Sequence, residues 1–194
     1  MQPSDEQLMQ AYQDGALEAL QELFERYRLR MFRFCLGLLG NRADAEDVAA
    51  EAFFVIIETP ERFDPAQRFS TWAYAIAHHK CVSRLRARRR LVLHAPARRD
   101  GDPEDAGIEE LPDLGDPIWV RLSREDRARL VRCAINRLPE EHKAALLLRQ
   151  DRGLSYAEIS GVLNCTLAKV KILLFRAKEQ LRRDLAPLLK EERQ

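Results

Sequence analysis

A run of basic residues directly follows a run of aromatic and small apolar residues between positions 69 and 90, FSTWAYAIAHHKCVSRLRARRR. The second half of this stretch carries cationic side chains: Lys80, Arg84, Arg86, Arg88, Arg89 and Arg90. Such groups bind phosphate and are rarely buried without a partner. Aromatic rings stack on bases while cations follow the backbone, so the combination favours partly single-stranded nucleic acid. The ordinary alternative is an amphipathic helix with a solvated basic end.

A second candidate for nucleic-acid binding lies near the end of the chain. Ser155 and Glu158 form a capping box that opens a helix through Leu163, and Asn164 is one of the few residues that enter a left-handed turn at low cost. The next helix has an apolar inner face: Val170, Leu174, Ala177 and Leu181. Its outer face is basic: Lys169, Lys171, Arg176 and Lys178. This spacing predicts a helix-turn-helix whose second helix enters a major groove, and the alternative is a plain helical hairpin.

Acidic residues form a third candidate surface on a helix predicted from about 43 to 58. One stripe of this helix, Val48, Ala52 and Ile56, is apolar and faces a core. Another stripe is acidic: Asp44, Asp47 and Glu51. The acidic stripe is either solvated or a docking surface for a partner.

No catalytic or metal-binding pattern accompanies these surfaces. The sequence contains neither a phosphate-binding loop nor a nucleophile motif, and the paired carboxylates are better explained as docking charge. His78 and His79 with Cys81 indicate a helix face, since the further ligands of a metal site are missing. We therefore expect a protein that is not an enzyme, with no cofactor, metal or small-molecule substrate.

The elements that position these residues are predicted to be helices throughout. A short helix covers 5–13, Asp14 and Gly15 form a turn, and a long helix ends before Gly40. The core stripe of the long helix is Leu20, Phe24, Tyr27, Met31, Phe34, Cys35 and Leu38. Two prolines bracket a loop that leads into position 69, and helical periodicity resumes at Ser123.

Length and charge distribution indicate two small domains with a linker. The chain has 194 residues and 46% hydrophobic content, which is sufficient for packed cores. The formal net charge is only +1, yet residues 100–117 contain eight acidic residues, no basic ones, three glycines and three prolines. Such a segment cannot offset its ordering entropy by burial. We predict an all-α protein with domains at 1–90 and 123–194, joined by a flexible acidic linker at 91–122.

Location and redox state are also predicted from the sequence. It has no apolar run near the length of a membrane span, and the start MQPSDEQ lacks the parts of a signal peptide. We expect a cytoplasmic protein without membrane insertion. The four cysteines are far apart and form no paired motif, so reduced and mostly buried thiols are expected.

Three segments in a fixed order resemble a known family: DAEDVAAEAF at 44–53, RFSTWAYAIAHH at 68–79 and LPEEHKAALLLRQDRGLSYAEISGVLNC at 138–165. Together they resemble the extracytoplasmic-function (ECF) group of bacterial RNA polymerase sigma factors. The resemblance implies an alternative sigma factor that binds core RNA polymerase and directs promoter-specific initiation. Its implied partners are the polymerase, mainly its largest (beta-prime) subunit, promoter DNA and an anti-sigma factor. The other hypothesis is a helix-turn-helix regulator that binds DNA without entering the polymerase.

The resemblance also implies three sets of contact residues. The set that docks on the polymerase clamp helices is Asp44, Glu46, Asp47, Val48, Glu51 and Phe53. The set that captures and melts the minus-ten element is Arg68, Ser70, Thr71, Trp72, Ala75, His78, His79, Arg84, Arg86 and Arg88. The set that reads the minus-thirty-five element is Ser155, Tyr156, Thr166, Lys169, Lys171, Ile172, Leu173, Arg176 and Lys178.

The chain departs from the family pattern at a few of these positions. Ala50 stands where glutamine is usual, His79 where asparagine is usual, and Ile172 and Leu173 where a serine-arginine pair is usual. Apolar side chains contact a thymine methyl but do not replace a guanidinium. Since Ile172, Leu173 and Phe175 cannot all join the inner stripe, we expect part of their surface to be exposed in the isolated domain. We expect an anti-sigma factor, the linker or the amino-terminal domain to cover it in the resting protein.

The sequence also predicts how substitutions at three places affect stability. Trp72→Ala is predicted to cost about 3–5 kcal/mol if the ring is packed. Removing arginines between 84 and 90 is predicted to spare folding, and reversing charge at Asp47 and Glu51 is predicted to leave the fold intact.

Overall fold

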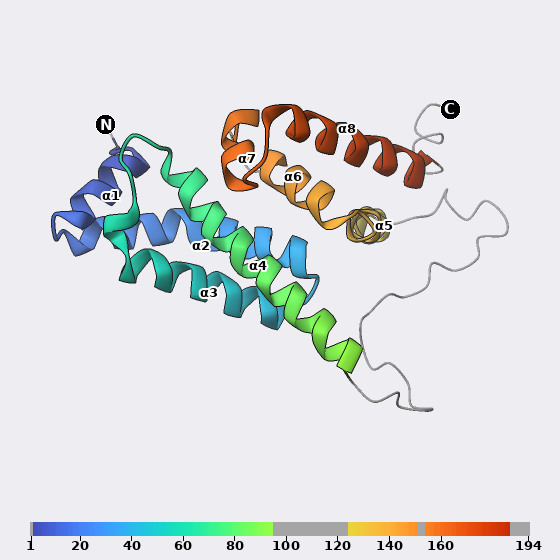
Figure 1. Cartoon of the computed structure of the whole chain (residues 1–194), viewed down its shortest axis with the longest axis horizontal. Coiled ribbons are helices and arrows are strands. Elements are labelled where there is room, and N and C mark those ends of the chain that lie inside the picture. Colours follow the sequence, from blue (N-terminus) through green and yellow to red (C-terminus); the bar gives the residue numbers. More distant parts are fainter. Residues whose placement is uncertain (1, 95–123, 151–153, 187–194) are drawn as a thin grey trace.

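A computed structural model describes residues 2–94, 124–150 and 154–186 of the chain (Figure 1). Within these ranges every regular element is helical, so the predicted all-α class is confirmed. In chain order the elements are α1 (Asp5–Gln13), α2 (Leu17–Leu39), α3 (Arg42–Glu58), the 3₁₀ turn η1 (Pro60–Arg62), α4 (Phe69–His94), α5 (Arg124–Asn136), α6 (Glu140–Gln150), α7 (Tyr156–Val162) and α8 (Leu167–Asp184).

The first helices begin and end where the local sequence predicts. The turn after α1 has Gly15 at φ +101°, and α2 ends at Gly40 with φ +70°, a left-handed conformation that favours glycine. The predicted core stripe of α2 is buried from Tyr27 onward. Leu20 is half-buried and Phe24 is 41% exposed, so the stripe begins later than predicted. Phe24 packs instead against the side of α3, where its ring meets Phe53.

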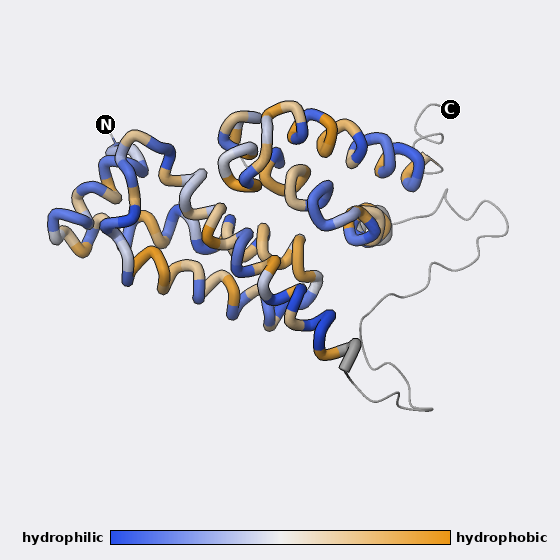
Figure 2. Tube along the Cα trace, in the orientation of Figure 1, coloured by the Kyte–Doolittle hydropathy of each residue, from blue (hydrophilic) through white to orange (hydrophobic). Residues whose placement is uncertain are grey.

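Helix α4 crosses the amino-terminal helices and carries both predicted halves of the 69–90 stretch. Phe69, Ala73 and Ala77 are buried, as predicted, and Trp72 and Ile76 are half-buried against the same core. Figure 2 shows the later turns of α4 as mainly hydrophilic. The helix continues to His94, four residues past the predicted domain boundary. The remainder of the predicted linker lies outside the described residues, as does Gly153.

Helices α6 and α7 pack directly on α2 and α4, so one apolar core continues from the first part of the chain into the second. Leu147 of α6 lies against Gly37 of α2, where an added Cβ would stand 2.7 Å from Leu147 Cδ1. The absence of a side chain at Gly37 therefore permits this close approach. Helix α8 packs on α6 and α7 and lies on their outer side, away from α2 and α4 (Figure 1).

Among the residues that the structure describes, none of the helices combines the length and the apolar character that a membrane crossing requires.

Candidate functional site

The acidic stripe of α3 faces basic residues of α4. Arg84 donates to Asp44 (Nη1 to Oδ1, 2.7 Å) and to Glu51 (Nη2 to Oε1, 3.0 Å). Asp47 lies 3.8 Å from the same guanidinium, and its side chain is 67% exposed. Two more cations reach the cluster: Arg88, 3.4 Å from Asp44, and Lys80, 3.2 Å from Glu51. Arg84 therefore joins α4 to α3, and its predicted contact with DNA stays a prediction.

Arg84→Ala is expected to lower the free energy of unfolding by about 1–3 kcal/mol, because Asp44 and Glu51 lose charge-assisted hydrogen bonds. Burial alone would lower the pKa of Arg84, but its bonds to Asp44 and Glu51 outweigh burial and hold the pKa above its ordinary value. Urea denaturation followed by circular dichroism measures the change. Arg86 is exposed on the same helix, and Arg86→Ala serves as the control, with an expected change below about 0.5 kcal/mol. Equal midpoints for the two variants would show that Arg84 is dispensable for folding, as the sequence alone predicts.

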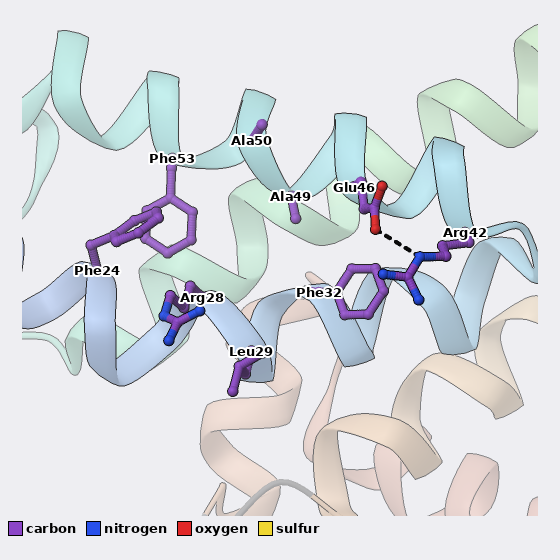
Figure 3. A pocket seen from close by; sticks show the side chains of 9 residues that line it. All are labelled: Phe24, Arg28, Leu29, Phe32, Arg42, Glu46, Ala49, Ala50 and Phe53. Atoms are coloured by element: carbon purple, nitrogen blue, oxygen red, sulfur yellow. Dashed lines mark hydrogen bonds and ion pairs between the residues drawn. The ribbon is translucent and has the colours of Figure 1, made fainter.

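The opposite side of α3 forms an open pocket with α2, with a volume of about 350 Å³ (Figure 3). At one end the rings of Phe24 and Phe53 meet edge to face, with centroids 4.8 Å apart. At the other end Arg42 donates to Glu46 (Nε to Oε1, 2.8 Å). Ala50 lies between these ends, on the α3 wall. Two members of the predicted docking set, Glu46 and the buried Phe53, thus line this pocket, whereas Asp44, Asp47 and Glu51 lie toward α4.

Exposed apolar residues on α3 were not identified from the sequence. Phe54 is 62% exposed and Ile57 is 41% exposed, whereas Val48 is buried. Val48 therefore holds α3 against the core, which corrects its assignment as a direct polymerase contact. A signal was present in the segment AFFVII at 52–57, which is apolar at every position and so has more apolar surface than one buried stripe requires.

Phe69 anchors the beginning of α4 in an aromatic cluster. Its ring lies 5.0 Å from that of Tyr27, 5.9 Å from that of Phe63 and 6.1 Å from that of Trp72, measured between centroids. Its backbone N–H donates to Glu6 of α1 at 3.2 Å. Phe69 is fully buried, so this part of the aromatic stretch is scaffold, and the half-buried Trp72 presents only part of its ring.

Part of the predicted minus-ten face of α4 is covered by the second half of the chain. Thr71 Cγ2 lies 3.1 Å from the position of a Cβ added to Gly161 in α7, and Thr71 Oγ1 is buried without a hydrogen-bond partner. Arg68 Nε is 3.7 Å from Glu158 Oε1, and farther along α4 Arg89 donates to Glu140 at 2.5 Å. The hydroxyl oxygen of the half-buried Thr71 is therefore inaccessible to a DNA strand while α7 stays in this position.

His78 lies in the same covered region. Burial lowers the pKa of His78 below its ordinary value, His79 lowers it further, and the carboxylates of Glu141 and Glu140 oppose the shift. Of the other members of the minus-ten set, the exposed ones are Arg68, His79, Arg86 and Arg88, and the half-buried ones are Ser70, Trp72 and Ala75. The structure thus divides this set into exposed residues and a half-buried central part.

The predicted helix-turn-helix is present in α7 and α8. Ser155 Oγ accepts from the Glu158 N–H at 3.2 Å, and Glu158 accepts from the Ser155 N–H at 2.6 Å, which completes the capping box. Asn164 has φ +47° in the turn. Thr166 then caps α8, because its Oγ1 accepts from the Lys169 N–H at 3.2 Å. The hydroxyls of Ser155 and Thr166 thus act first as helix caps. Tyr156 is half-buried, with the Arg149 guanidinium 5.3 Å over its ring.

The buried face of α8 differs from the predicted one at two positions, because Leu181 is only half-buried and Leu173 is added. Val170, Leu174 and Ala177 are buried, as predicted. Leu173 is also buried, which corrects its assignment as a DNA contact. The outer positions of α8 are exposed: Lys169, Lys171, Ile172, Phe175, Arg176 and Lys178. Lys169 Nζ is held 2.8 Å from Glu141 Oε1 of α6, and this bond raises the pKa of Lys169.

Comparison with known proteins places these surfaces in a family. The Sigma-70 region 2 family matches residues 23–91, and the Sigma-70 region 4 family matches residues 128–181. The chain is 34% identical to the RNA polymerase sigma-H factor of Pseudomonas aeruginosa over 98% of both chains. It is 32% identical to the ECF RNA polymerase sigma-E factor of Haemophilus influenzae over 97% of this chain and 98% of that protein. The chain belongs to the ECF group of RNA polymerase sigma factors.

Solved structures support the fold of this sigma factor. CnrH, solved in complex with the cytosolic domain of CnrY, matches with a TM-score of 0.67 at 20% identity over 95% of this chain and 98% of that chain. The sigma factor RpoE, solved with the anti-sigma factor NepR from Bartonella quintana, matches with a TM-score of 0.65 at 18% identity over 86% of this chain and 96% of that chain.

Family membership also decides between the two functions considered from the sequence. The protein is an alternative sigma factor that directs transcription initiation, and the hypothesis of a regulator that acts outside the polymerase is the less favoured one. The matched region 2 ends within α4, and the matched region 4 begins within α5.

Proposed function

We propose that the sigma factor docks on the largest subunit of core RNA polymerase through the outward face of α3. This face has an apolar centre, Phe54 and Ile57, on the same side of the helix as the exposed carboxylate of Asp47 and the small Ala50. Interfaces commonly have an apolar centre with a charged rim. The joint exposure of Phe54, at 62%, and Ile57, at 41%, on one side of α3 is the observation that carries this proposal, because contiguous exposed apolar surface commonly marks an interaction site.

Phe54→Ala is expected to weaken binding to core polymerase by about 2 kcal/mol, roughly thirtyfold in Kd, and to leave the unfolding midpoint unchanged. Fluorescence titration of labelled sigma factor with core polymerase measures the affinity. Leu17→Ala is the matched control, because Leu17 is 69% exposed on α2 and is not on the α3 face. Equal affinity for the Phe54 variant and the control would place polymerase docking elsewhere on the molecule.

The acidic residues on α3 contribute unequally to this proposal. Asp47→Arg changes the most exposed carboxylate, so we expect weaker core binding with little loss of stability. Glu51→Arg also removes one partner of Arg84 and a partner of Lys80, so it is expected to destabilise the packing of α3 on α4. The structure therefore separates two residues that the sequence treats alike. If both variants unfold at the same urea concentration, that separation is incorrect.

We further propose that promoter DNA contacts two parts of the chain. The exposed cations of α4, Arg86 and Arg88 together with Arg68 before it, follow the strand backbone at the minus-ten element. The outer face of α8 reads the minus-thirty-five element in the major groove. This division assigns polymerase binding and melting to the part that ends with α4, and upstream recognition to the part that begins with α5.

An anti-sigma factor is the remaining proposed partner. RpoE in the solved complex is bound to the anti-sigma factor NepR, and its fold matches this chain. We propose a comparable partner for this protein.

Run-off transcription with purified core polymerase tests the proposed function as a whole. We expect the chain to copurify with core polymerase and to direct initiation at defined start sites on genomic fragments. A chain that binds duplex DNA alone and gives no start-site-specific transcript with core polymerase would support a regulator that acts outside the polymerase.

A further inference from the structure

The outer face of α8 carries an exposed apolar pair. Ile172 is 51% exposed and Phe175 is 66% exposed, and their spacing of three residues places them side by side on the helix. The amino-terminal helices do not cover them, because α6 and α7 make the contact with α2 and α4 and α8 lies on the far side. The expectation that the amino-terminal domain masks this pair is therefore wrong. Residues 95–122 of the predicted linker lie outside the described ranges, so masking of the pair by the linker stays a prediction.

Exposed basic residues outnumber acidic ones around the apolar pair, and Glu179, one turn after Phe175, is held by Arg182. Lys171, Arg176 and Lys178 are exposed on α8, and they form no ion pair with any residue in the described ranges. Lys169, in contrast, is held by Glu141. A cationic surface that encloses two apolar side chains fits the major groove of duplex DNA, where phosphates flank base edges. Thymine is the base that presents a methyl group there.

We propose that Ile172 is a specificity-determining residue that contacts a thymine methyl in the upstream promoter element, with Phe175 packed beside it. This inference rests on the proposed reading of DNA by α8. Ile172 lies in the second turn of a helix that starts at Leu167, within the part of a recognition helix that approaches base edges. Its side chain has no hydrogen-bonding group, so it distinguishes thymine from cytosine or uracil by apolar contact alone. Leu173 is buried and takes no part.

Single-methyl substitution in the DNA tests the proposal directly. Holoenzyme assembled from this chain and core polymerase first selects upstream sequences from a randomised promoter library. Each thymine of the selected element is then replaced singly by deoxyuridine, which removes only the methyl group. For the wild type we expect one or two positions where deoxyuridine weakens binding about threefold to tenfold, the effect of one buried methyl group. For Ile172→Ser we expect that deoxyuridine at one of these positions weakens binding by less than about twofold.

The control variant is Val131→Ser, because Val131 is an exposed apolar residue on α5 rather than α8. It should retain the wild-type response to deoxyuridine. Circular dichroism of Ile172→Ser should match the wild type, since the side chain is half exposed.

Three results would overturn the inference. One is that deoxyuridine has no effect at any position, and another is that Ile172→Ser keeps the full wild-type response. If Lys171→Ala and Arg176→Ala nevertheless weaken binding to the upstream element, α8 still binds this DNA, and only the role of Ile172 is contradicted. The third result is that no upstream sequence is enriched and the Lys171 and Arg176 variants bind like the wild type. That result would contradict the proposal that α8 reads DNA at all. A protein partner would then explain the exposed apolar pair.

Discussion

Replacing Phe69 with alanine is expected to lower the free energy of unfolding by about 3–5 kcal/mol. Phe69 is fully buried and its ring contacts those of Tyr27, Phe63 and Trp72, so alanine leaves a cavity between α1, α2 and the start of α4. Urea denaturation followed by circular dichroism measures the loss. A change below about 1 kcal/mol would mean that the aromatic cluster rearranges to fill the space.

Two control variants distinguish burial from aromatic character. Phe175→Ala removes a ring that is 66% exposed, so its expected change is within about 0.5 kcal/mol. Trp72→Ala removes a ring that is only half-buried, so we expect a smaller loss than for Phe69, and less than the sequence-based prediction for a packed ring. The order of the three effects follows burial, because the transfer of apolar area from water dominates each of them.

Introducing a charge at the contact between α6 and α2 is expected to separate the two halves of the sigma factor. Leu147 lies against Gly37, and Leu147→Asp places a carboxylate in this apolar contact. A loss of about 2 kcal/mol of interface energy raises the ratio of separated to packed molecules roughly thirtyfold. Small-angle X-ray scattering should then report a larger radius of gyration.

The same separation is expected to increase binding of single-stranded minus-ten DNA. Thr71 and His78 are partly covered in the packed arrangement, and the apparent affinity for a strand rises with the fraction of molecules in which they are accessible. Fluorescence anisotropy with a labelled oligonucleotide measures the affinity. Leu17→Asp, at an exposed site on α2, is the control. It should leave the radius of gyration and the oligonucleotide affinity unchanged. If Leu147→Asp retains native helicity and its oligonucleotide affinity equals that of the wild type, the α7 contact does not limit access to α4.

The sequence by itself determined the features that depend on residues within a few positions of one another. The capping box of Ser155 and Glu158 and the left-handed Asn164 occur where predicted, because each requires only local hydrogen bonds and backbone preference. The buried positions Val170 and Leu174 followed from helical periodicity. The family was also identifiable, since three motifs occur in a fixed order along the chain.

Only the tertiary structure decided which sides of these helices stay accessible. Arg84 belongs to an ion-pair cluster because α4 packs beside α3, with partners 40 and 33 positions away in sequence. Leu173 is buried while Ile172 is exposed, because the packing of α8 on α6 and α7 determines which side of α8 is covered. Thr71 is covered because α7 approaches α4 at Gly161. Periodicity shows that a helix has an apolar side, but the width of that side and the partner that covers it depend on contacts between distant segments.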